Sequence, residues 1–100
     1  MSDLLLTLLC PRALEESLLD TLIHIEGIPV LSATPSEFHA LRADTLTQAE
    51  QVLGFAKATE VRLLVSSSQM PELLETLKKQ FAGIGLRYWT TPVLDSGDFK

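Results

Sequence analysis

One hundred residues are enough for one hydrophobic core and too few for two, so the sequence predicts a single domain over residues 1–100. The chain is 46% hydrophobic and 21% charged, which argues against a disordered chain. Eight Lys and Arg against 13 Asp and Glu give a formal net charge of -5, and this acidic balance argues against a nucleic-acid partner. The single cysteine, Cys10, cannot form a disulfide within the chain, which fits a reducing compartment.

The first residues superficially resemble a lipoprotein signal, because a run of leucines precedes Cys10. No Lys or Arg precedes the leucines, however, and the bulky Leu9 stands where a lipidated cysteine requires a small residue. The apolar run is also far shorter than the ~20 residues of a membrane-spanning helix. We therefore predict a cytoplasmic protein with no direct membrane insertion.

The chain begins with a pattern that predicts a strand, a helix and a second strand. The continuous apolar run at 4–9 predicts a strand buried on both faces. From Pro11 onward, apolar residues recur at helical spacing, and Gly27 is positioned to end this helix. Residues 28–38 contain two prolines among apolar and hydroxyl side chains, which is typical of an edge strand.

Residues 39–55 change character and predict an excursion from the sheet, because they are richer in Thr, Gln and Ala. Within them, the sequence TQAE at 47–50 matches a capping box, in which a hydroxyl and a carboxylate satisfy exposed amides at a helix start. This short match predicts one or two helical turns at 48–53.

The second half of the chain repeats the order strand, helix, strand. Residues 60–65 alternate, with Leu64 on the opposite side from the valines. Pro71 opens a second amphipathic helix that ends near Gly83. Residues 86–94 are rich in aromatic and Thr side chains and predict the last strand.

This order, β-α-β-β-α-β, predicts an α+β fold of the ferredoxin-like sandwich type. Both helices of such a fold cover one face of a four-stranded sheet, and the other face is open. Leu64 and Trp89 are expected on the open face, where a soluble monomer rarely exposes large apolar groups. The sequence therefore predicts an oligomer.

Two short motifs carry a family resemblance. The sequence EQVLG at 50–54 and the sequence YWTTPV at 88–93 resemble the DUF3240 branch of the PII-like signalling proteins, which are related to nitrogen regulatory proteins. The resemblance implies a homotrimer with ligand clefts between subunits, and a T-loop-like excursion between strands 2 and 3 that contacts ligands or partner proteins. It also implies a link to heavy-metal efflux, with a membrane transporter or a regulatory protein as partner.

The candidate ligand-binding residues are Arg42, Glu50, Gln51 and Trp89. The first three lie in the excursion, where loop residues are more often functional than core residues, although a solvated loop with a helix cap explains them equally well. Trp89 either stacks on a ligand or packs in the subunit interface. We favour the interface, because aromatic residues are enriched there.

The candidate metal ligands are Glu37 and His39, which alternate on one strand face at the start of the excursion. A three-fold assembly would bring several copies of this pair together. His24 follows Asp20 by four residues, which is compatible with half of a metal site but is better explained as a surface pair. Cys10 closes a buried strand and is expected to be a packed thiol rather than a nucleophile.

No catalytic constellation is visible, so we predict a protein that is not an enzyme. The leading hypothesis is a small PII-like regulator that binds a small ligand or a metal at subunit clefts and signals through residues 39–55. The alternative is a metal-binding, metal-tolerance protein resembling CutA, which shares the trimeric design. PII-style ATP binding is disfavoured, because the segment 82–85 between the second helix and the last strand contains no basic side chain. The first basic residue after it is Arg87, and phosphate needs several converging amides or cations.

Overall fold

The computed structural model describes residues 3–39 and 56–99. The described residues form one four-stranded antiparallel sheet and two α-helices, and a short 3-10 turn, η1, precedes the first helix. The elements in chain order are β1 (Asp3–Pro11), η1 (Arg12–Leu14), α1 (Glu15–Ile23), β2 (Leu31–Phe38), β3 (Ala56–Ser66), α3 (Met70–Phe81) and β4 (Arg87–Val93).

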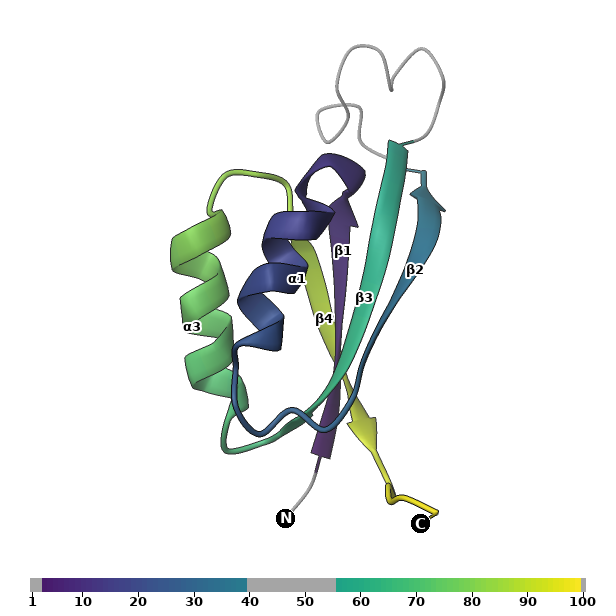
Figure 1. The fold of residues 1–100 in the computed structure, drawn as a ribbon, viewed down its shortest axis with the longest axis vertical. Helices are drawn as coiled ribbons and strands as arrows, with labels where there is room; N and C mark the ends of the chain where they lie inside the picture. The colour runs from purple at the N-terminus through teal and green to yellow at the C-terminus, as the bar shows by residue number, and fades with distance from the viewer. Residues whose placement is uncertain (1–2, 40–55, 100) are drawn as a thin grey trace.

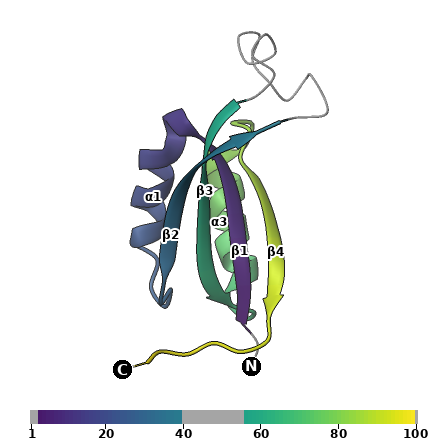
Figure 2. The same cartoon turned by 90° about the vertical axis from the view of Figure 1, so that its right-hand side faces the viewer.

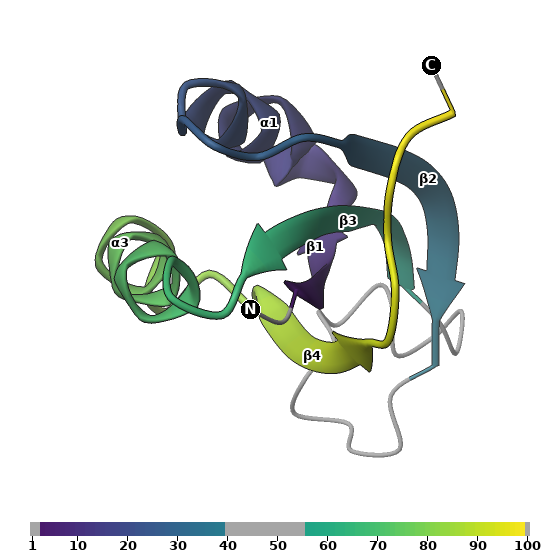
Figure 3. The ribbon, with the colours of Figure 1, turned by 90° about the horizontal axis from the view of Figure 1, so that it is seen from below.

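The sheet has the strand order β2-β3-β1-β4, and all three neighbouring pairs are antiparallel (Figures 1 and 2). Both helices lie on the same side of the curved sheet (Figure 3). The chain therefore has the predicted α+β ferredoxin-like architecture, with one helix-covered face and one open face. None of the helices in the described ranges is sufficiently long and apolar to cross a bilayer.

The core lies between the sheet and the helices. It forms because alternate side chains of β1 and β3 point toward the helices, and each helix presents an apolar stripe to them. Gly27, with φ 85°, turns the chain after α1 in a conformation that favours glycine. The buried cluster comprises Leu6, Leu8, Cys10, Leu18, Leu22, Val61, Leu63, Val65, Met70, Leu73, Leu77 and Phe81.

The observed elements differ from the predicted ones mainly at their ends. β1 continues through Pro11, which is paired with Ala58, so the expected helix starts as a 3-10 turn and becomes α-helical only at Glu15. β3 starts at Ala56, four residues earlier than expected, because its residues 56–63 pair with the whole of β2. Pairing between strands, which local sequence does not report, sets these ends.

The expectation that the first strand is buried on both faces holds only in part. On the helix side, Leu6 and Leu8 are buried. On the open side, Thr7 is also buried, whereas Leu5 and Leu9 are half-buried. The open face of β1 therefore still exposes apolar surface.

Candidate functional site

The open face of the sheet is built from three cross-strand rows, fixed by the register of β1 with its neighbours. The first row contains Leu64, Leu5 and Thr91, and the second contains Arg62, Thr7 and Trp89. The third contains Glu60, Leu9 and Arg87. We call these nine residues the open-face patch. It runs from an apolar row to a charged row within one strand length.

Trp89 is the largest apolar side chain of the open-face patch and is 44% exposed. Its neighbour Tyr88 points to the other side of the sheet, as the alternation predicts. Leu64 is half-buried and lies on the same face as Trp89. Apolar groups of this size, gathered on an uncovered sheet face, are suited to packing against another protein surface.

The charged side chains of the patch are paired along β3. Arg62 Nε donates a hydrogen bond of 2.6 Å to Glu60 Oε1, and Arg62 Nη2 contacts the same oxygen. The two residues are separated by one position, so they lie on the same face of the strand. The Arg62 side chain is exposed and the Glu60 side chain is half-buried, so water screens the pair in part and it contributes little to stability by itself.

The excursion leaves and re-enters the sheet at adjacent points. Phe38 at the end of β2 is paired with Ala56 at the start of β3, and Glu37 is paired with Lys57. The first turn after β1 lies at the same end of the molecule (Figure 1). Both ends of the excursion are therefore held by one β ladder.

Arg12 ties that ladder together from the turn after β1. Its Nη2 donates a hydrogen bond of 2.8 Å to the Ala58 carbonyl oxygen and one of 3.4 Å to the Ser36 carbonyl oxygen. Thr59 Oγ1 also donates a hydrogen bond to the Glu15 carboxylate. These bonds link η1 and α1 to the two strands that carry the excursion.

Sequence reasoning missed Arg12 and Glu15 as residues that hold the two strands on either side of the excursion. Arg12 directly follows the buried strand, but its partners are 24 and 46 residues away in the chain. The only local signal was a cation at a strand end, and a single cation there has many explanations.

The predicted metal ligands, Glu37 and His39, lie beside the start of the excursion and are both exposed. Glu37 is in β2 on the helix side of the sheet, opposite Lys57 in register, and His39 comes directly after β2. In the two described ranges, no three His, Cys, Asp or Glu side chains gather as a metal-binding group. The predicted ligand residues Arg42, Glu50 and Gln51 lie outside the described residues.

Cys10 is a packed core thiol, as predicted, since only 1% of its surface is exposed. Burial, and to a smaller extent the charge of nearby Glu15, raises the pKa of Cys10 to about 11. The un-ionised thiol is a poor nucleophile.

His24 does not pair with the Asp20 carboxylate. Its Nδ1 lies 2.6 Å from the Asp20 backbone carbonyl oxygen, and because a carbonyl only accepts, Nδ1 is the donor. The ring thus caps the last turn of α1, which explains the four-residue spacing.

The sequence matches one family model, and the fold matches several solved structures. The model of DUF3240, described as a protein of unknown function, matches residues 1–100. A crystal structure of a DUF3240 family protein from Shewanella baltica has a TM-score of 0.82 at 19% identity, covering 100% of this chain and 99% of that chain. A comparison with curated proteins gives no significant match.

Two further structures carry the PII-like fold. A protein of Thermus thermophilus, described as a putative PII-like signalling protein, has a TM-score of 0.66 at 16% identity, covering 93% of this chain and 88% of that chain. The GlnK–ATP complex of B. subtilis has a TM-score of 0.67 at 15% identity, covering 92% of this chain and 82% of that chain. At these identities the likeness establishes the fold.

Proposed function

The chain belongs to the DUF3240 family, and we propose that it is a PII-like regulatory protein that catalyses no reaction. It binds a small ligand or a metal at clefts between subunits and signals to a partner protein through residues 39–55. The observation that carries the proposal is the family match over residues 1–100, together with a fold shared with PII-like signalling proteins.

This function requires assembly, because a cleft between subunits requires neighbouring subunits, and the apolar surface of the open-face patch supports it. We propose a homotrimer in which Trp89, Leu64 and Leu5 are buried between sheets. Burying a large apolar side chain stabilises an interface by roughly 1.5 to 3 kcal/mol. The paired charges of Arg62 and Glu60 give the same surface a polar rim, as interfaces usually have.

The excursion is suited to signalling because the ladder below it is held from a second direction by Arg12. A ligand bound through Arg42, Glu50 or Gln51 would act on a segment whose two ends are fixed. The partner is then a membrane transporter or a regulatory protein in the cytoplasm, with a link to heavy-metal efflux.

A deletion tests the proposal. Residues 42–54 are replaced by a short Gly-Ser linker, and the two proteins are compared by calorimetric titration with ATP, Zn²⁺, Cu²⁺ and Ni²⁺. We expect the wild type to bind at least one of these probes and the deletion variant to lose that binding while sedimenting as the same trimer. Equal binding by both proteins would contradict the role of the excursion. If the wild type stays a monomer of 11.0 kDa, the proposed ligand clefts between subunits cannot form.

The alternative function, a CutA-like metal-binding protein, is supported by the position of Glu37 and His39 at the start of the excursion. Titration of wild type, Glu37→Gln and His39→Gln with Cu²⁺, Zn²⁺ and Ni²⁺ tests it. The wild type should bind with a dissociation constant below the millimolar level, which corresponds to a binding free energy of about 4 kcal/mol. Each variant should bind more weakly than the wild type. Unchanged affinity in both variants would rule out these ligands.

A further inference from the structure

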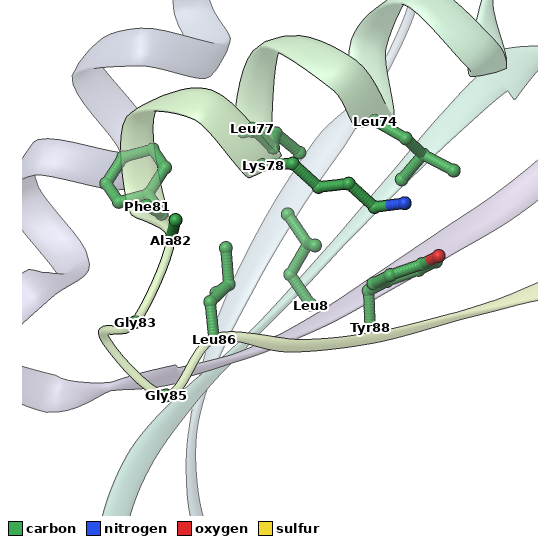
Figure 4. A pocket seen from close by; sticks show the side chains of 10 residues that line it. All are labelled: Leu8, Leu74, Leu77, Lys78, Phe81, Ala82, Gly83, Gly85, Leu86 and Tyr88. Carbon is green, nitrogen blue, oxygen red and sulfur yellow. The ribbon is translucent and has the colours of Figure 1, made fainter.

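A pocket of about 310 Å³ opens between the second half of α3 and the first half of β4 (Figure 4). Its size is at the lower end of the ~300–1,000 Å³ typical of small-molecule sites. It lies on the helix side of the sheet, away from the open-face patch, and all of its walls come from one chain. The lining residues that the argument uses are Leu8, Leu74, Leu77, Lys78, Phe81 and Tyr88.

The pocket has an apolar interior and a polar side. Leu8 of β1 forms its floor, and Leu77 and Phe81 of α3 form one wall. The Lys78 side chain extends toward the Leu74 end, where its ammonium points to the same side as the Tyr88 hydroxyl (Figure 4). The two polar groups therefore lie together at one end, and the opposite end is apolar.

The Lys78 ammonium has no ion pair with any described residue, in contrast to its neighbour. Lys79 lies 3.7 Å from Glu75, four residues earlier on the helix, whereas the residue four before Lys78 is Leu74. The Tyr88 hydroxyl likewise has no hydrogen bond with a described residue. Two donors at the rim of an apolar pocket are thus available to a ligand.

We propose that this pocket binds a small monocarboxylate with an apolar body, such as a medium-chain aliphatic acid. The carboxylate accepts hydrogen bonds from Lys78 Nζ and Tyr88 Oη, and charge-assisted bonds of this kind are the stronger ones. The apolar body lies against Leu8, Leu77 and Phe81. A polyphosphate fits poorly, because Lys78 is the only cation among the described residues that line the pocket, and phosphate needs several converging donors.

The site goes beyond the proposed function, since it needs neither a subunit cleft nor residues 39–55. It would exist in a monomer as well as in a trimer. Its presence is therefore tested independently of assembly and of the excursion.

Titration with octanoate, followed by methyl NMR of the leucines, tests the proposal. We expect saturable shifts confined to the leucines of the pocket, with submillimolar affinity. Lys78→Gln should weaken binding about tenfold, which corresponds to about 1.4 kcal/mol, and Tyr88→Phe should weaken it less. Lys79→Gln is the matched control, since it removes the same charge one residue away, and it should leave the affinity unchanged.

Three results would overturn the site. One is the absence of saturable shifts with octanoate at millimolar concentration. Another is equal weakening by Lys78→Gln and Lys79→Gln, which would indicate nonspecific attraction of an anion. The third is equal affinity for octanol, the uncharged analogue, which would mean that the carboxylate does not contribute to binding. Lys78 is exposed, so its variant is expected to fold, and circular dichroism checks this.

Discussion

The two faces of the sheet differ although they are made by the same strands. On the helix side, Leu6, Leu63 and Val61 are at most 1% exposed. On the open side, Trp89 is 44% exposed and Leu5 and Leu64 are half-buried. The first face is completed by the chain itself, whereas the second still has apolar surface to bury. We infer that folding depends on the first face, and the proposed assembly would use the second.

The largest expected effect on the unfolding free energy comes from truncating a buried side chain on the helix-covered face. Leu63→Ala removes a fully buried side chain from the core, and such truncations cost about 2 to 5 kcal/mol because a cavity remains. Urea denaturation followed by circular dichroism measures the loss of unfolding free energy. A loss below about 1 kcal/mol would mean that the helix side is not the main source of stability.

The next largest effect is expected from a charged substitution on the open face. Leu64→Asp places a charge in the apolar row, so the proposed trimer should dissociate, because a buried unpaired carboxylate is strongly unfavourable. Sedimentation equilibrium measures the mass, and circular dichroism should show a folded subunit. Lys79→Gln, an exposed change on α3, serves as the control and should leave the mass unchanged. A Leu64→Asp protein that remains trimeric would place the interface elsewhere.

A smaller effect on stability is expected from Arg12, which bonds to the two strands on either side of the excursion. Arg12→Gln removes hydrogen bonds to the Ala58 and Ser36 carbonyls and should cost about 1 kcal/mol. Hydrogen exchange should show faster opening of the amides at the end of β2 and the start of β3, with the rest of the sheet unchanged. Uniformly faster exchange would indicate a global loss of stability instead.

The smallest expected effect is a pH dependence of the unfolding free energy that comes from Cys10 and is absent at neutral pH. Its folded-state pKa is raised to about 11 from an ordinary value near 9, so the folded protein holds its proton more tightly than the unfolded chain. The associated stability is complete below pH 9 and is lost as the pH rises through 11, with a slope approaching about 1.4 kcal/mol per pH unit. Urea denaturation of wild type and Cys10→Ala across this window should show the steeper decline in wild type. Parallel curves would contradict the shift.

The fold could be predicted to a large extent because its signals are local. Alternation at 60–65, the helical stripe after Pro71 and the family motifs at 50–54 and 88–93 each depend on neighbouring residues. The ferredoxin-like order and the family were confirmed on these grounds. The side on which Leu64 and Trp89 lie also followed from alternation.

The site was less predictable because its contacts are distant in sequence. Thr59 and Glu15 are 44 residues apart, and no local pattern indicates that they meet. The four-residue spacing from Glu75 indicates in the sequence that Lys79 is paired, but only the fold shows that Lys78 lies beside a pocket whose other walls come from β1 and β4. The roles of Arg42, Glu50 and Gln51 stay predictions.

The pairing of Phe38 with Ala56 and of Glu37 with Lys57 has a consequence for how the family can diversify. The entropy of closing a flexible chain between two fixed points grows with the logarithm of its length, so doubling the length costs only about 0.6 kcal/mol. A flexible insert between His39 and Ala56 would thus have little effect on the stability of the sheet. New binding specificity can consequently be added at this position with little loss of stability.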